Sequence, residues 1–274
     1  MKISIVITTY NRPDALTLVL RGLAAQTASD FEVLVADDGS KAETAAALAA
    51  LKPSLPYPLR HVWQPDDGFR APMARNRASA VAQGDYVIFL DGDCVPLADF
   101  VSQHRRLAAP GWFVSGNRVL LDRRLSERAA REQVPLWRWT AGQWLRARLS
   151  GGVNRFTPLL RLVDWSQARR DWVGAKTCNL AVWRNDLLAV NGFDEDFVGW
   201  GYEDSDLVQR LLNAGRRRRA TRWAVPVLHL WHAAQDRSRE RANLARLEQT
   251  VASGTERAAR GIDQYLTPEP AGIA

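Results

Sequence analysis

A run of five aromatic and aliphatic residues, from Tyr86 to Leu90, ends in the acidic triplet Asp91-Gly92-Asp93. The run is too short for an independent helix and consists of good strand formers, so it predicts a buried strand. Gly92 allows the backbone to bend so that both carboxylates converge at the carboxyl end of the strand, where open α/β sheets place their ligands. The triplet indicates a site for a hard cation, although a polar turn that only caps the strand fits these three residues equally well.

The preceding segments alternate between strand and helix patterns. Strands are predicted at residues 3–9, 31–36 and 59–63, and helices after Pro13, at 41–51 and at 70–83. This alternation predicts an α/β fold with a doubly wound, mostly parallel central sheet and flanking helices. Right-handed crossovers bring the carboxyl ends of parallel strands to one edge, which is typical of a nucleotide pocket. The residues expected at that edge are Thr8, Tyr10, Asp38 and Asp91.

The sequence contains neither a Gly-x-Gly-x-x-Gly fingerprint nor a Walker-type phosphate loop. The phosphates of a nucleotide would therefore need another counter-charge. A divalent cation on Asp93, together with Arg75 or Arg77 on the preceding helix, could supply it.

Acidic residues also crowd the start of a helix in the second half of the chain. The segment Gly-Trp-Gly-Tyr-Glu-Asp at 199–204 precedes a helical pattern at 207–214. Interaction of the acids with the helix dipole is one explanation, and each acid would contribute roughly 0.3–1 kcal/mol. The two glycines around Trp200 are poor helix formers and favour a loop that folds over a ligand instead. A strand at 225–230 then delivers His229 and His232, three residues apart.

Four motifs in the first hundred residues resemble, in order, those of family 2 glycosyltransferases of the GT-A fold. They read Ile-Val-Ile-Thr-Thr-Tyr-Asn-Arg, Ala-Asp-Asp-Gly-Ser, Gly-Phe-Arg-Ala-Pro-Met-Ala-Arg-Asn-Arg-Ala and Leu-Asp-Gly-Asp. The resemblance implies a UDP-sugar donor bound by the matching residues. Those residues are Thr8, Tyr10 and Asp38 around the base, Arg75 near the base and diphosphate, Asp91 on the ribose or metal, and Asp93 on the metal.

The segment at 199–204 resembles the Gly-Trp-Gly-x-Glu-Asp motif of β-1,4-galactosyltransferases and of bacterial chondroitin-type polymerases in family 2. The resemblance implies that Glu203 lies near the sugars and that Asp204 is the catalytic base, with Trp200 and Gly201 at the acceptor. Galactosyltransferases of this type also place two metal ligands three residues apart, methionine and then histidine. This chain has His229 and His232 at the matching positions, and carboxylate, diphosphate and imidazole ligands suit Mn²⁺ better than Mg²⁺.

Basic residues concentrate in the middle of the chain. The formal net charge is +7, and residues 118–170 alone carry twelve arginines against four acids, a local net charge of +8. Within this segment a helix with interleaved tryptophan and arginine could lie on an anionic membrane, with Trp137, Trp139 and Trp144 at the headgroup level. The alternative is that these tryptophans pack on the core. A second basic run, at 216–219, is predicted to be a solvated turn.

These features divide the chain into a GT-A domain at 1–235 and a closing helix with a tail at 236–274. The domain comprises a nucleotide-binding half at 1–110, a basic helical insertion at 122–170 and an acceptor and catalytic half at 171–235. The sequence shows no signal peptide and no membrane span, so we expect a cytoplasmic protein, peripheral at the inner face of the cell membrane if the basic patch meets lipid. Cys94 and Cys178 are expected to be buried thiols.

The predicted function is an inverting, metal-dependent transfer of a hexose or N-acetylhexosamine, with galactose type favoured, from a UDP-sugar. The acceptor is expected to be a glycan or a lipid-linked sugar in bacterial surface polysaccharide or lipopolysaccharide synthesis. A sugar-nucleotide-forming nucleotidyltransferase fits less well, because it gives no role to residues 199–204. A non-catalytic membrane- or polysaccharide-binding protein is disfavoured because every acid needed for catalysis is present, and nucleic-acid binding through 136–148 is the weakest alternative.

Overall fold

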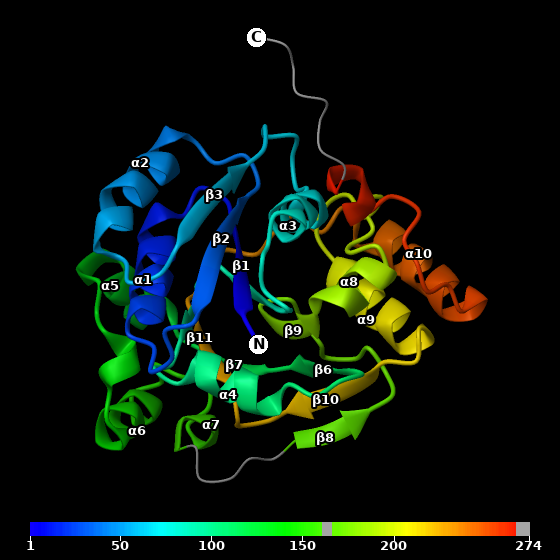
Figure 1. Ribbon diagram of the computed structural model, residues 1–274. Helices are drawn as coiled ribbons and strands as arrows, with labels where there is room; N and C mark the ends of the chain where they lie inside the picture. Colours follow the sequence, from blue (N-terminus) through cyan, green and yellow to red (C-terminus); the bar gives the residue numbers. More distant parts are fainter. Residues whose placement is uncertain (161–165, 267–274) are drawn as a thin grey trace.

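The computed structural model describes residues 1–160 and 166–266. Within them, an eight-stranded sheet runs through the molecule, and four of its seven strand pairings are parallel (Figure 1). The predicted α/β class with a mostly parallel central sheet is confirmed. In spatial order the strands are β3 (Leu59–Trp63), β2 (Phe31–Asp37), β1 (Ile3–Thr9), β4 (Tyr86–Asp91), β9 (Asn179–Trp183), β6 (Trp112–Ser115), β10 (Arg217–Thr221) and β8 (Ser166–Arg169).

Helices cover both faces of this sheet. Helices α1 (Pro13–Ala24) and α2 (Ala42–Leu51) lie on one face, and α3 (Ala71–Ala80), α8 (Arg184–Ala189) and α9 (Glu203–Asn213) lie on the other (Figure 1). Side chains alternate along each strand, so Ile5 packs in the core beneath α1 whereas Val6 packs in the core beneath α3 and α9. The strand β1 is therefore buried from both sides and holds its carboxyl end rigidly. Elsewhere in the described chain are α4 (Phe100–Leu107), α10 (Glu240–Ser253) and the short 3-10 helices η1 (Lys52–Ser54) and η3 (Ile262–Tyr265).

The predicted basic insertion is helical through Leu160, but its described end at 166–169 is the strand β8, which pairs with β10, so the helical prediction is wrong there. It contains α5 (Arg123–Glu132), the 3-10 helix η2 (Leu136–Arg138), α6 (Ala141–Leu149) and α7 (Thr157–Leu160). Residues 161–165 of the insertion, and the predicted tail from 267 onward, lie outside the described residues. No helix in the described part of the chain is long and apolar enough to span a bilayer.

The tryptophans of the insertion pack inward. Trp144 is only 3% exposed, and Trp137 and Trp139 are partly buried against the same core. The rings of Trp139 and Trp144 lie 4.7 Å apart. Of the two alternatives for these tryptophans, packing on the core is the one that the structure shows.

A separate three-stranded sheet joins three distant segments. Its central strand is β11 (Pro226–His229), which pairs antiparallel with β5 (Cys94–Pro96) and parallel with β7 (Asn117–Leu120). The register places His229 opposite Cys94, directly after the acidic triplet. This sheet therefore carries the histidine segment to the metal-candidate residue Asp93.

The prediction that residues 216–219 form a solvated turn is wrong. Residues 217–221 form the strand β10, and Arg218 is only 3% exposed. The Arg218 guanidinium donates to Ser115 Oγ at 2.8 Å and to the carbonyl oxygens of Asp171 and Val173 at 2.7 and 2.9 Å. These hydrogen bonds compensate for burying the charge inside a sheet.

A buried histidine predicts that the fold loses stability in acid. Burial lowers the pKa of His104 from 6.5 to about 4, because the neutral ring lies inside the core with Nε2 against Asn179 Oδ1 at 3.1 Å. The unfolded chain therefore binds the extra proton first, and stability should fall as the pH drops from 6.5 toward 4, by about 3 kcal/mol. Urea unfolding of wild type and His104→Gln at several pH values measures the effect. Glutamine keeps a donor toward Asn179 and does not titrate, so an equally steep loss in the variant would contradict the assignment to His104.

Candidate active site

A cleft of about 780 Å³ opens at the carboxyl ends of the parallel strands β1, β2 and β4. The acidic triplet forms one part of its lining and the Gly-Trp-Gly loop forms another. The cleft brings together eleven of the predicted site residues: Thr8, Tyr10, Asp38, Arg75, Asp91, Asp93, Trp200, Gly201, Glu203, Asp204 and His232. His229, the remaining one, is not among the lining residues and approaches Asp93 from β11.

Gly92 lies close to β1 where the triplet turns, so a side chain there would be crowded. A Cβ atom at this position would lie 3.0 Å from the carbonyl oxygen of Thr8 and 3.2 Å from Thr9 Oγ1. The Gly92 amide donates to the same Thr8 carbonyl at 2.8 Å. The glycine thus lets the turn fold back onto β1, which positions Asp91 and Asp93 at the cleft.

Arg75 lies at the centre of an ionic network beneath the cleft and is 4% exposed. Its Nε donates to Thr8 Oγ1 at 2.8 Å. Its Nη1 and Nη2 contact carboxylate oxygens of Glu203 at 3.3 Å and of Asp91 at 3.4 Å. Burial lowers the pKa of Arg75, but the carboxylates of Asp91, Glu203 and Asp204 outweigh burial and raise the pKa overall. The guanidinium therefore ties β1, β4 and α9 together.

The two adjacent acids at the start of α9 have different surroundings. Glu203 is 7% exposed and paired with Arg75, and burial, followed by the charge of Asp204, raises the pKa of Glu203 despite that pairing. The Asp204 carboxylate accepts from the backbone N–H of Ser205 at 2.7 Å and has no cationic partner within 4 Å among the described residues. Asp204 is thus the acid that remains available to a ligand.

The Gly-Trp-Gly loop that precedes α9 depends on unusual backbone conformations. Gly199 and Gly201 have φ values of +78° and +113°, and Tyr202 also adopts a left-handed conformation at +68°. Arg237 stacks over Trp200 with its guanidinium carbon 4.7 Å from the ring centroid. The loop is therefore held from outside by the segment that follows His232.

Asp93 is flanked by two imidazoles. His232 Nε2 lies 3.5 Å from one carboxylate oxygen and His229 Nε2 lies 3.9 Å from the other. His232 Nδ1 is 2.7 Å from the carbonyl oxygen of Ala233, which can only accept, so Nδ1 is the donor there and Nε2 is the ring nitrogen that faces Asp93. Burial lowers the pKa of His229, which favours its neutral form.

These donors fit a divalent cation. His232 Nε2 and the Asp93 carboxylate face each other at 3.5 Å, and two metal–ligand bonds of about 2.0–2.2 Å can bridge that separation. The hydrogen bond from His232 Nδ1 to a backbone carbonyl is also the usual outer support of a metal-bound histidine. Asp93 and His232 are therefore suited to hold the metal, and His229 is 0.4 Å farther from the carboxylate than His232 is.

The two cysteines meet beside this site. An Asp91 carboxylate oxygen and the Sγ atoms of Cys94 and Cys178 all lie within 4.8 Å of one another. Burial raises the pKa of Cys94, and the neighbouring Cys178 raises it further, so the Cys94 thiol stays protonated and is a poor ligand. Both cysteines are buried and free, as expected from the sequence.

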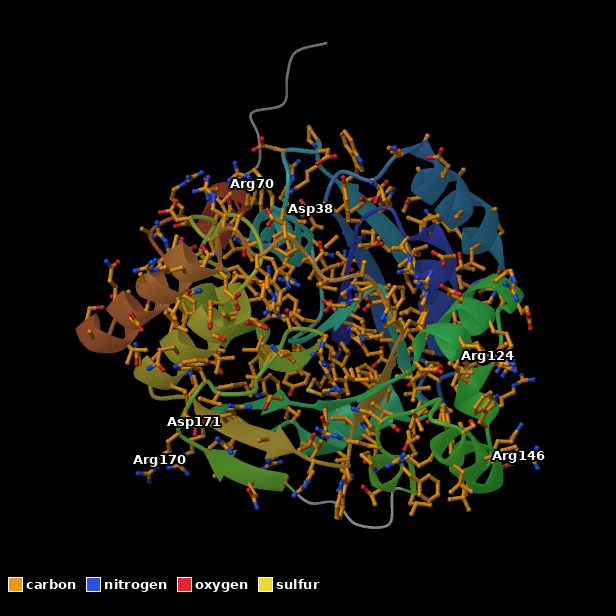
Figure 2. All side chains as sticks on the ribbon, turned by 180° about the vertical axis from the view of Figure 1, so that it is seen from behind. Asp38, Arg70, Arg124, Arg146, Arg170 and Asp171 are labelled. Carbon is orange, nitrogen blue, oxygen red and sulfur yellow. The ribbon has the colours of Figure 1, made fainter. Side chains whose placement is uncertain are left out.

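The predicted nucleoside side of the cleft combines an exposed ring with a buried acid. Tyr10 is 49% exposed, and its hydroxyl donates to Asp66 Oδ2 at 2.9 Å. Asp38 accepts from the backbone N–H of Arg70 at 2.9 Å and from Gln64 Nε2 at 2.8 Å, and Figure 2 shows Asp38 and Arg70 next to each other. Burial raises the pKa of Asp38 to about 6, although these two hydrogen bonds lower it. Asp38 therefore fixes the loop before α3, while Tyr10 is free to contact a base.

Sequence reasoning missed several residues of the cleft. Arg118 was counted only as part of the basic patch, yet β7 carries it into the lining, where it has no carboxylate within 4 Å among the described residues. Trp172 and Tyr202 also line the cleft, with ring centroids 6.2 Å apart, and Lys176 is a further lining residue. Only the pairing of β7 with β11 places Arg118 here, and no local pattern signals that pairing.

An α/β sheet with an acidic turn and a paired-acid helix start at one cleft fits the GT-A class of glycosyltransferases, and comparison with known proteins supports that class. Two solved structures share this fold at low sequence identity. Staphylococcus aureus TarS residues 1–349 in complex with UDP has a TM-score of 0.60 and 15% identity, covering 97% of this chain and 70% of that one. GalNAc-T7 with UDP, GalNAc and Mn²⁺ has a TM-score of 0.63 and 15% identity, covering 91% of this chain and 48% of that one.

Family comparisons then assign the chain. The model of glycosyl transferase family 2 matches residues 4–155, and the model described as the N-terminal domain of galactosyltransferase matches residues 158–230. The chain belongs to glycosyl transferase family 2, which confirms the resemblance seen in its motifs.

Characterised relatives are similar over most of the chain. Validoxylamine A glucosyltransferase of Streptomyces hygroscopicus subsp. jinggangensis is 31% identical over 244 residues, which is 83% of this chain and 56% of the relative. Escherichia coli chondroitin synthase is 29% identical over 234 residues, which is 78% of this chain and 32% of the relative. The chain thus spans little more than half of the first of these relatives and about a third of the second.

Proposed function

We propose that this protein transfers a sugar from a UDP-sugar to a glycan or lipid-linked acceptor with inversion at the anomeric carbon. The observation that carries the proposal is the contrast between the two acids at the start of α9. Glu203 is neutralised by Arg75, whereas Asp204 faces the cleft without a cationic partner among the described residues. Neighbouring carboxyl groups with different surroundings are the usual arrangement when one of them acts as a base.

Asp204 accepts the proton of the acceptor hydroxyl as the hydroxyl oxygen attacks the anomeric carbon. The bond between that carbon and the diphosphate oxygen breaks in the same step, and UDP leaves. Trp200, Trp172 and Tyr202 offer aromatic faces for the sugars at the cleft. The Arg75 network keeps Glu203 and the start of α9 in place, so the distance between base and donor is set by β1 and β4.

The departing diphosphate requires positive charge. A divalent cation, when bound by Asp93 and His232, supplies a Lewis acid for this purpose, and the mixed oxygen and nitrogen donors favour Mn²⁺ over Mg²⁺. Arg118 adds a second charge at the same wall of the cleft, since its guanidinium is not committed to a carboxylate in the described part of the chain. In its most specific form, the proposal is that the donor carries a galactose-type sugar and that the acceptor belongs to surface polysaccharide or lipopolysaccharide synthesis.

Nucleotide binding gives the first test. UDP with Mn²⁺ at about 100 times its dissociation constant should stabilise the native protein by roughly 2.7 kcal/mol, seen as a higher Tm. Asp93→Ala should abolish the gain because the cation loses its carboxylate. Asp67→Ala removes a carboxylate whose side chain is 75% exposed and should retain it. Equal stabilisation by GDP or CMP would contradict the uridine assignment.

Turnover gives the second test. A panel of UDP-sugars is incubated with Mn²⁺, and UDP release is measured with and without candidate acceptors. We expect UDP release from one UDP-sugar of the panel, and we expect that release to increase when a suitable acceptor is added. A protein that binds UDP but releases none from any UDP-sugar, with acceptors of all the named classes present, would refute transferase activity.

A further inference from the structure

We infer that the outer surface of α5 and α6 docks on an anionic lipid bilayer. This surface, called here the α5–α6 face, consists of Arg123, Arg124, Leu145, Arg146, Arg148 and Leu149, all of which are exposed. The inference extends the proposed function, in which the acceptor is linked to a lipid. The docking itself is argued from the surface alone, and only its use in catalysis rests on the proposed function.

The two helices form one continuous surface. Gly152 donates its amide to the carbonyl of Ala147 near the end of α6 at 2.7 Å, and its own carbonyl accepts from the amide of Asp122, the N-cap of α5, at 2.9 Å. The last turn of α6 therefore lies against the first turn of α5. Figure 2 shows Arg124 and Arg146 projecting from the same side of the molecule, away from Arg170.

The exposed face of α6 is apolar as well as basic. Leu145 and Leu149 are 45% and 79% exposed and, four residues apart, lie on one side of the helix. Trp144 and Ala147, on the opposite side, are buried in the core. The inner side of α6 thus packs on the core, while its outer leucines remain largely exposed to solvent. A bilayer interface accepts such leucines with flanking arginines.

The arginines of this face are largely uncompensated. Arg124, Arg146 and Arg148 have neither an ion pair nor a side-chain hydrogen bond within residues 1–160 and 166–266. Arg123 is the exception, because it pairs with Glu127 at 2.6 Å. Free guanidinium groups beside exposed leucines match the phosphate layer and the acyl boundary of an anionic membrane.

The face continues to the rim of the cleft. Arg123 stacks over the ring of Trp231, with 4.8 Å between the guanidinium carbon and the ring centroid, and the Trp231 amide donates to Ser126 Oγ of α5 at 2.7 Å. Trp231 is 39% exposed and precedes His232, which lines the cleft. A membrane at the α5–α6 face would thus hold a lipid-linked acceptor close to the reaction.

A bilayer fits this face better than a nucleic acid does. Binding of single strands relies on exposed aromatic rings that stack on bases. On this face the exposed apolar groups are aliphatic: Trp144 is buried, Trp137 and Trp139 are partly buried against the core, and the ring of Trp231 at its edge is covered by Arg123.

Vesicle binding of the full chain tests the inference. Wild type should co-sediment with vesicles of phosphatidylcholine and phosphatidylglycerol and not with phosphatidylcholine alone, and salt should release it. Arg146→Gln/Arg148→Gln should weaken partitioning about twenty-five-fold, since each arginine near an anionic surface contributes about fivefold. Leu145→Ser/Leu149→Ser should also weaken it while leaving the salt dependence unchanged. The matched control is Arg170→Gln/Arg241→Gln, which removes the same charge from two exposed positions, one directly after β8 and one on α10, and should bind as wild type does.

Three results would overturn the inference: equal binding to both vesicle types or to neither, an unchanged affinity of Arg146→Gln/Arg148→Gln, or an equal loss in the control. Tight binding of an oligothymidylate that the same double variant abolishes would assign the face to nucleic acid instead. The assay requires no turnover, so it separates the two proposals. A protein that binds anionic vesicles but neither binds UDP nor turns over UDP-sugars would refute the proposed function and leave the docking face standing.

Discussion

Replacing Asp204 with asparagine should leave a folded protein that binds UDP and hardly turns over. Asparagine keeps the size of the side chain and an oxygen that accepts from the Ser205 amide, so the start of α9 should be preserved. It cannot take a proton at the pH of the reaction. A positioned general base contributes roughly 10²- to 10⁴-fold, and the loss should appear in kcat with little change in the UDP-dependent rise of Tm.

Two further variants separate the base from its surroundings. Glu203→Gln keeps an acceptor for Arg75 and should lose less turnover than Asp204→Asn. Glu43→Gln removes an exposed acid from the first turn of α2, far from the cleft, and should behave as wild type. If Asp204→Asn keeps near-normal turnover while Glu203→Gln is inactive, the roles of the two acids are exchanged.

Replacing Arg75 with methionine should cost about 3–5 kcal/mol of the free energy of unfolding, because it strands a buried carboxylate. Glu203, whose side chain is 8% exposed, would lose its cationic partner. Thr8 would lose the 2.8 Å hydrogen bond from Nε. Burial already raises the pKa of Glu203, so in the variant this carboxylate is readily protonated, which removes the unpaired buried charge. The difference in the free energy of unfolding between variant and wild type should therefore shrink as the pH falls toward the acid range.

Arg77→Met is the matched control, since it makes the same change on the same helix. Arg77 lies over the ring of Tyr265, with 5.7 Å between the guanidinium carbon and the centroid, and contacts no carboxylate within 4 Å among the described residues. Urea unfolding at neutral and acid pH measures both variants. A similar cost for the two would mean that Arg75 is an ordinary helix residue and that the ionic network contributes little.

The sequence predicted those parts of the site that depend on local patterns. Residues 86–93 were predicted as a strand and an acidic turn because the apolar run and the glycine between two aspartates are adjacent in the sequence. The parallel topology then brings Thr8 and Asp38 to the same edge of the sheet. The Gly-Trp-Gly loop was found in the same way, from glycines that no helix would use. Their roles in catalysis stay predictions.

What the sequence could not predict depends on contacts between distant segments. Arg75 was expected beside a ligand, but it contacts two protein carboxylates, Asp91 at the end of β4 and Glu203 at the start of α9. The basic run at 216–219 was predicted to be solvated because a charged strand inside a sheet is rare. Arg218 is buried there because Ser115 Oγ and the carbonyls of Asp171 and Val173 accept hydrogen bonds from its guanidinium. Arg118 reaches the cleft because β7 pairs with β11, and the residues next to Arg118 in the sequence do not predict that pairing.

The antiparallel pairing of β4 with β9 has a consequence during synthesis of the chain. Tyr86 of β4 pairs with Trp183 of β9, so one edge of β4 has no partner strand until the ribosome has made residue 183. At a typical rate this stretch takes roughly 5–20 s. For that time the nascent chain presents an apolar strand edge of the kind that invites pairing with other chains. Translation speed between β4 and β9, and any chaperone that covers β4 in the meantime, should therefore control how much of the protein is recovered folded.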